Sequence, residues 1–252
     1  MLASIRSCLF ILIMAVTVIF WATATVLCAP LPVRVRYDIA SSWPRLMLKF
    51  GRWICGMRWQ VIGTENLPDH PVIVLCKHQS TWETFFLVSQ MPRHAAFVFK
   101  REILFIPFFG WAIGMLDMMH IDRRQGRRAF ASIVKSAPHQ FTEHNRWIVM
   151  FPEGTRIPAG RMGEYKSGGA RLAVQNDTPI LPVAVNAGRL WPKKPFIKKP
   201  GLITVSYGPV ISVSGKSADQ VNREVETWIE TEMRRIDADS YAENDKVYTP
   251  RH

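Results

Sequence analysis

The sequence predicts an α/β protein, a single layered domain with a mainly parallel sheet, preceded by an N-terminal membrane-anchoring helix. Two observations predict this class. Short β-branched runs alternate with helical segments along most of the chain, and the first thirty residues are almost free of charge. The chain of 252 residues is long enough for one domain with a sizeable core. Its 48% hydrophobic content argues against a disordered protein.

The N-terminal stretch between Arg6 and Arg34 carries no charged side chain. As a helix, residues 8–28 are long enough to cross a hydrocarbon core of about 30 Å. A cleaved signal peptide is the alternative, with Ala22-Thr23-Ala24 resembling a cleavage site. Because the apolar run continues beyond that site, we expect residues 1–33 to form a transmembrane or membrane-anchoring helix.

Residues 34–58 mix basic side chains with Trp and Leu. An amphipathic helix from Trp43 to Trp59 would suit the headgroup layer of a bilayer, and it would also suit the surface of a soluble core. The preceding anchor favours the membrane, so we expect residues 34–58 to form an amphipathic interfacial segment. Basic residues are far more frequent after the apolar stretch than before it: Arg34, Arg36, Arg45, Lys49, Arg52 and Arg58. The positive-inside rule then predicts that the body of the protein lies on the cytoplasmic side of the membrane.

The net charge of +12 is unevenly distributed. The first 216 residues hold 27 basic and 11 acidic side chains, which gives +16, while the remainder is acidic. Such a basic body predicts an anionic partner, either nucleic acid or a phospholipid surface. The anchor favours an anionic phospholipid bilayer, and no nucleic-acid-binding motif is present, so we expect no nucleic acid partner. Neither the four cysteines nor the histidines have metal-ligand spacing, so we expect no metal.

The elements expected in residues 59–240 alternate as a parallel α/β domain requires. We expect strands at residues 72–76, 97–99, 118–121, 147–151, 180–185 and 202–207. We expect helices at residues 81–90, 127–141, 168–175 and 218–236, followed by a loose polar tail at 241–252.

The first candidate motif is Lys77-His78-Gln79-Ser80-Thr81-Trp82-Glu83, directly after a predicted strand. A histidine at a strand end can hydrogen-bond a carboxylate five residues later in the next helix, which leaves its second ring nitrogen as a general base. A structural interpretation competes with this, because Ser80-x-x-Glu83 is also a capping box.

The second candidate motif is Phe151-Pro152-Glu153-Gly154-Thr155-Arg156, at the end of another predicted strand. Ligands of open α/β sheets bind beyond the carboxyl ends of strands. Here Gly154 would allow a close backbone approach and Arg156 could bind a phosphate, although an ordinary turn with a solvated Arg has the same pattern.

Together the two motifs resemble the H-x-x-x-x-[D/E] and F-P-E-G-T-R signature of the glycerolipid acyltransferase family. The similarity extends from about Trp59 to Gly208. It includes two further blocks, Lys100-Arg101-Glu102-Ile103-Leu104 with Pro107 and Gly110, and Ile180-Leu181-Pro182-Val183. One departure is Glu83, where most members have Asp; the charge is kept and a methylene is added.

The resemblance implies an enzyme that acylates the sn-2 hydroxyl of lysophosphatidic acid, with acyl-CoA or acyl-carrier protein as donor and no cofactor, and so makes phosphatidic acid for phospholipid biosynthesis. It also implies a location in the bacterial inner (cytoplasmic) membrane, with the catalytic domain on the cytoplasmic side. It implies that His78 and Glu83 are catalytic, that Lys100 and Arg156 bind the phosphate, and that Glu153, Gly154 and Thr155 shape the substrate wall. Residues 103–116 are a candidate wall for the acyl chain or ordinary core. Two alternatives stay open: another lysolipid as acceptor, or a non-catalytic anchored protein that binds anionic lipid.

Overall fold

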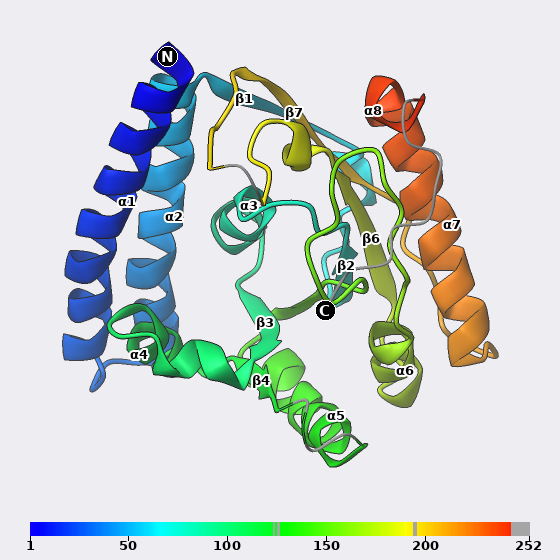
Figure 1. Ribbon diagram of the computed structural model, residues 1–252. Coiled ribbons are helices and arrows are strands. Elements are labelled where there is room, and N and C mark those ends of the chain that lie inside the picture. Colours follow the sequence, from blue (N-terminus) through cyan, green and yellow to red (C-terminus); the bar gives the residue numbers. More distant parts are fainter. Residues whose placement is uncertain (123, 125–126, 194–195, 243–252) are drawn as a thin grey trace. The chain divides into compact units, whose positions relative to one another are not determined.

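The computed structural model describes residues 1–122, 124, 127–193 and 196–242 (Figure 1). The chain forms two compact units. The first comprises Met1–Cys55 and Thr84–Ile148. The second comprises Gly56–Glu83 and the chain from Val149 onward. Most strands run parallel, as expected for an α/β protein.

The first unit begins with two long helices, α1 (Leu2–Leu27) and α2 (Val33–Cys55), which lie side by side (Figure 1). Two indole N–H groups connect them. Trp43 Nε1 donates to Thr17 Oγ1 at 3.0 Å, and Trp21 Nε1 donates to Ser42 Oγ at 2.7 Å. Among the described residues, α1 is the one helix long and apolar enough to cross a membrane. Its large apolar side chains are mostly exposed, as an anchoring helix requires.

The amphipathic helix was expected from Trp43 to Trp59, and these bounds are wrong. The helix begins ten residues earlier, at Val33, and ends at Cys55. Gly56 follows with a φ of +73°, which glycine adopts without strain and which stops a helix. Trp59 instead belongs to a strand, β1 (Met57–Ile62), that the sequence pattern did not predict.

The rest of the first unit contains a short parallel strand pair, β3 (Ala95–Lys100) and β4 (Met119–Ile121). Its remaining elements are most of α3 (Trp82–Gln90), η2 (Arg101–Phe105), α4 (Phe109–Gly114) and α5 (Arg127–Thr142). Residues 103–116 are not ordinary core. Phe105 and Trp111 are exposed, and Ala112 and Leu116 are buried. The role of this segment as an acyl-chain wall stays a prediction.

The second unit contains β1, β2 (Ile73–Cys76), β6 (Ile180–Val185) and β7 (Gly201–Tyr207). Strand β1 pairs parallel with β7, β2 pairs parallel with β6, and β6 and β7 are antiparallel. Every residue of β2 and β6 is buried, as the near-continuous apolar sequence of a covered strand predicts. The first half of strand β5 (Trp147–Met150) belongs to the first unit and its second half to the second unit.

Helices α6 (Gly168–Gln175) and α7 (Ala218–Ile236) complete the second unit and match the expected bounds. Helix α7 buries Val221, Val225, Ile229 and Met233, which share one helical face. A short helix, α8 (Ala238–Ala242), follows, so the first two residues of the expected loose tail are ordered and Tyr241 is buried. The rest of that tail, residues 243–252, lies outside the described residues.

Candidate active site

His78 and Glu83 contact each other as their spacing predicts. His78 follows β2 directly, Glu83 lies in the first turn of α3, and His78 Nδ1 is 2.9 Å from Glu83 Oε1. The carboxylate side chain is 1% exposed and the imidazole 17% exposed, so the pair lies at the edge of the interior with solvent on the side of the ring. Because Glu83 occupies Nδ1, Nε2 is the ring nitrogen that can take a proton from a substrate.

Half of the capping box predicted for Ser80 and Glu83 is present, because Glu83 reaches back to the N–H of Ser80 but Ser80 Oγ accepts from Trp82 and not from Glu83. Glu83 Oε1 accepts the backbone N–H groups of Gln79 at 2.7 Å and Ser80 at 2.6 Å, and Ser80 Oγ accepts the N–H of Trp82 at 3.0 Å. One carboxylate oxygen therefore accepts the N–H groups of the turn that precedes α3 and orients the histidine. Three donors on one buried atom fix its position closely, so the catalytic and structural interpretations of the motif are compatible.

The second motif packs directly on the first within the second unit. Glu153 Oε2 accepts the backbone N–H of His78 at 2.8 Å, and the backbone N–H of Ile157 donates to the carbonyl of His78 at 2.8 Å. The Phe151 ring stacks on the imidazole with 3.9 Å between centroids and 16° between planes. Main chain and side chain of His78 are thus held by the loop after β5.

Arg156 and Gly154 lie in the same loop. Arg156 is partly exposed, and its Nη1 donates to Thr81 Oγ1 at 3.1 Å, which sets the guanidinium beside the start of α3. Gly154 has a φ of +65°, a backbone conformation that favours glycine. The turn geometry of the motif therefore depends on this residue type, as the sequence suggested.

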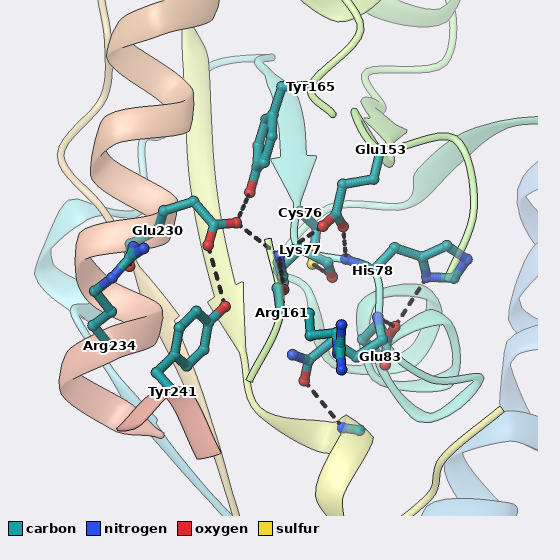
Figure 2. Close-up of polar contacts among 12 residues, drawn as sticks. Cys76, Lys77, His78, Glu83, Glu153, Arg161, Tyr165, Glu230, Arg234 and Tyr241 are labelled. Atoms are coloured by element: carbon teal, nitrogen blue, oxygen red, sulfur yellow. Dashed lines mark hydrogen bonds and ion pairs between the residues drawn. The ribbon is translucent and has the colours of Figure 1, made fainter. Parts of the chain in front are cut away.

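A buried cluster of charged side chains lies next to the His78 main chain and contacts the second motif through Glu153 (Figure 2). The Lys77 ammonium lies 2.6 Å from Glu153 Oε1 and 2.7 Å from Glu230 Oε1, and it donates to the carbonyl of Arg161 at 3.1 Å. Both the Lys77 and the Glu153 side chains are fully buried. One ammonium between two carboxylates partly neutralises charges that would be costly to bury alone.

Two tyrosines complete the cluster on the side of α7 (Figure 2). Tyr165 donates its hydroxyl to Glu230 Oε1 at 2.8 Å, and Tyr241 donates to Glu230 Oε2 at 3.2 Å. Burial raises the pKa of both phenols well above the ordinary value, and the adjacent Glu230 carboxylate acts in the same direction. The hydroxyls therefore remain donors. Burial also raises the pKa of the Glu153 carboxyl, which the Lys77 ammonium opposes.

The structure separates the predicted site residues into three groups. His78 and Glu83 are in contact, and Gly154, Thr155 and Arg156 are partly exposed in the adjacent loop. Glu153 cannot line a substrate wall with its carboxylate, because that group is enclosed between Lys77 and the main chain of His78. Lys100 ends β3 in the other unit and is exposed, so its phosphate-binding role stays a prediction.

Sequence reasoning missed the buried cluster. Its members are Lys77, Tyr165, Glu230 and Tyr241. One available signal was Lys77 itself, a charge directly after the apolar run of β2. A second was Glu230 beside Ile229 on α7, where the apolar periodicity places a buried face.

Comparison with known proteins identifies the family. A family model described as Acyltransferase matches residues 58–186, a range that contains both motifs. A curated 1-acyl-sn-glycerol-3-phosphate acyltransferase of Pseudomonas aeruginosa is 40% identical over 238 residues, covering 92% of each chain. The enzyme of the same name from Limnanthes douglasii is 29% identical over 90% of this chain and 80% of its own.

A solved structure has the same fold. The crystal structure of the 1-acyl-sn-glycerophosphate (LPA) acyltransferase from Thermotoga maritima superposes with a TM-score of 0.76 at 22% identity, covering 92% of this chain and 95% of that one. The matched family model and the extent of identity to the Pseudomonas enzyme lead to one conclusion: the chain belongs to the acyltransferase family.

Proposed function

We propose that this enzyme transfers a fatty acyl group from an acyl thioester to the sn-2 hydroxyl of 1-acyl-sn-glycerol-3-phosphate, with phosphatidic acid as product. The proposed donor is acyl-CoA or acyl-carrier protein, and the proposed pathway is phospholipid biosynthesis. The single observation that carries the proposal is the 2.9 Å contact between His78 Nδ1 and Glu83 Oε1. The names of its relatives supply the acceptor.

The chemistry follows from the orientation of the imidazole. His78 Nε2 removes the proton from the acceptor hydroxyl, and the resulting oxygen nucleophile attacks the thioester carbonyl. The carbon–sulfur bond then breaks, the sulfur leaves as a thiolate, and the thiolate takes the proton from His78 to become the free thiol. Glu83 stabilises the imidazolium that forms between these two steps. No covalent bond to the protein is required.

Arg156 is the residue proposed to bind the acceptor's phosphate in the second unit. Its guanidinium is partly exposed and is oriented by the 3.1 Å contact with Thr81 Oγ1. A planar guanidinium binds phosphate oxygens in pairs, which supports a headgroup contact. Lys100 is proposed as a second phosphate contact, with Gly154 and Thr155 forming the adjacent wall.

Helix α1 is proposed to anchor the enzyme in the bilayer that holds its lipid substrate. The helix has 26 residues, and most of its large apolar side chains are exposed. Basic residues that follow α1 support an inner-membrane location with the catalytic domain on the cytoplasmic side. Anionic phospholipids are the proposed surface partner of the basic chain.

The proposal is tested by acyl transfer to lysophosphatidic acid from labelled acyl-CoA and, separately, labelled acyl-carrier protein. We expect phosphatidic acid from the wild type and none above background from His78→Ala, and the two donors report the preference. Formation of product by His78→Ala at the wild-type rate would contradict the role of His78.

Other acceptors are the second arm of the same experiment. A wild type inactive on lysophosphatidic acid but active on another lysolipid would keep the chemistry and overturn the acceptor. Inactivity on every lysolipid, with both donors, would overturn the enzymatic proposal in favour of an anchored protein that binds anionic lipid.

A further inference from the structure

Three potential metal ligands converge in the first unit, beside the last turn of α5. Asp117 Oδ2 is 3.1 Å from His139 Nε2 and 2.8 Å from His144 Nε2. One candidate ligand atom from each residue can be chosen so that all three lie within 4.8 Å of one another. Histidine spacing did not reveal this group, because its third member comes from a turn more than twenty residues earlier in the chain.

We propose that Asp117, His139 and His144 form a binding site for a divalent transition metal ion, with Zn²⁺ as the preferred ion. Two imidazoles and one carboxylate are a ligand set for zinc sites that keep a fourth position for water or another ligand. In tetrahedral geometry with metal–ligand bonds of about 2.0–2.2 Å, two ligands are separated by about 3.3 Å. The two measured histidine–carboxylate distances are already close to this separation.

The surroundings of His139 provide a second, independent observation. Its Nδ1 lies 3.1 Å from Glu143 Oε1, while its Nε2 faces Asp117. A neutral imidazole has one N–H, so it can donate to only one of these two carboxylates. With a metal ion on Nε2, the Nδ1–H would donate to Glu143. This is the carboxylate–histidine–metal arrangement that orients metal ligands in proteins.

The main chain of Asp117, which carries the carboxylate ligand, is held in place from the interior. Asp117 has a φ of +50°, an uncommon conformation for a non-glycine residue. Its carbonyl accepts Gln140 Nε2 at 2.9 Å and Arg146 Nη1 at 3.2 Å. Gln140 and Arg146 are both buried, so the turn that presents Asp117 is supported from the interior. A ligand fixed in this way loses little conformational freedom when it binds an ion.

Exposure and charge also suit a cation. The side chains of Asp117, His139 and His144 are 49%, 41% and 18% exposed, so an ion can reach them from solvent. With neutral imidazoles, Asp117 and Glu143 give the group two negative charges, which a divalent ion would neutralise. Bound metal would connect the turn before β4 to the end of α5.

The site is tested by zinc binding to the full-length protein in detergent micelles after treatment with a chelator. Titration against a chromophoric zinc chelator is expected to show one tight zinc ion per chain. Co²⁺ is expected to give the visible absorption of a tetrahedral site. His144→Ala and Asp117→Asn should each lose the tight site, and Glu143→Gln should weaken it by about 10–100-fold.

His120→Ala is the matched control, because His120 is an exposed imidazole in the same unit that belongs to β4. It should bind zinc like the wild type. Circular dichroism checks that each ligand variant folds. If one does not, His139→Gln is measured in its place. Wild-type binding no tighter than that of the ligand variants, or an equal loss in His120→Ala, would overturn the proposal. Since the readout is metal binding, neither result bears on acyl transfer.

Discussion

The backbone N–H of His78 donates to Glu153 Oε2 at 2.8 Å, so a carboxylate of the second motif holds the main chain of the first. The imidazole of the same residue contacts a different carboxylate, that of Glu83, at 2.9 Å. Two motifs far apart in the sequence therefore fix the two parts of one histidine. Glu153 is accordingly a positioning residue, and its other oxygen is engaged by Lys77.

Replacement of Glu83 by Gln should separate the catalytic from the capping role of this residue. Gln keeps an oxygen that can accept the N–H groups of Gln79 and Ser80, but it lacks the charge that stabilises an imidazolium. We expect near-normal thermal stability and a fall in kcat on the order of 10²–10⁴-fold. Steady-state kinetics and a melting curve on the same preparation measure both quantities.

Ser80→Ala is the matched control for that variant. It removes the oxygen that accepts the N–H of Trp82 and leaves the charge of Glu83 unchanged. A lost cap costs about 0.5–2 kcal/mol, so this variant should melt earlier while it retains most of its kcat. Normal turnover in Glu83→Gln would reduce Glu83 to a helix cap.

Lys77→Met should destabilise the protein by about 3–5 kcal/mol, because it leaves Glu153 and Glu230 buried without their shared counterion. Burial already raises the pKa of the Glu153 carboxyl, and without the Lys77 ammonium this carboxyl would favour protonation in the folded state. Since the folded chain would bind more protons than the unfolded chain, the variant should lose stability as pH rises through the carboxyl range. Unfolding curves at several pH values measure this slope.

The double variant Lys77→Met/Glu230→Gln provides the test of the pairing. Removing one of the two carboxylates along with the ammonium should recover part of the lost stability, with a coupling energy of about 0.5–3 kcal/mol. Strictly additive losses would show that Lys77 and Glu230 do not interact as the 2.7 Å distance indicates.

Gly160→Ala should be strongly destabilising in the second unit. Gly160 has a φ of +72°, and a Cβ at this position would lie 2.0 Å from the carbonyl oxygen of Ser240 in α8. Gly215→Ala is the control, since Gly215 has a φ of +71° and no atom within 4 Å of the added Cβ. Only backbone strain, about 1–2 kcal/mol, is expected there. Equal melting temperatures for the two variants would contradict the close approach of α8.

His94 should make stability depend on pH. Burial lowers the pKa of His94 below its ordinary 6.5, although Asp38 opposes this shift from 2.9 Å. The unfolded chain therefore takes up the proton first. The contribution of neutral His94 to the free energy of unfolding should be fully present above pH 6.5. It should be lost as the pH falls towards the lowered pKa of the folded state.

His94→Phe is the variant for that measurement, because it keeps a ring to stack on Tyr37, 4.1 Å away, and cannot titrate. Its melting temperature should fall less than that of the wild type as the pH is lowered through this window. The same substitution at exposed His70 should leave the wild-type profile unchanged. An unchanged profile in His94→Phe would assign the pH dependence to other groups.

Sequence patterns predicted the elements whose periodicity is strong and whose ends carry clear signals. Helix α7 is an example, because Ser217 and Gln220 form a capping box at its start. The patterns failed for β1, where Gly56 separates a helix from a strand within a continuous run of Trp, Arg and Met. They also failed for α4, whose six residues are too few for a helical period to be recognised.

The active site could be predicted only where its contacts are local. His78 and Glu83 are five residues apart, so the geometry of a strand end and a helix start is enough to bring them together. Lys77 and Glu230 are 153 residues apart, and no local pattern encodes that contact. The enclosure of the Glu153 carboxylate has the same origin, because it contacts the main chain of His78, which is 75 residues away in the sequence.

Glu230 and Tyr241 come far behind both catalytic motifs in the sequence, and this order has a consequence for biosynthesis. A ribosome makes both catalytic motifs well before it makes α7 and α8, which supply these two partners of the buried cluster. A nascent chain can therefore hold His78 and Glu83 together while Lys77 and Glu153 still lack the group that completes their burial. The buried cluster next to His78 is complete only when α7 and α8 have been made. A chain truncated before α7 should therefore contain both catalytic motifs and remain inactive.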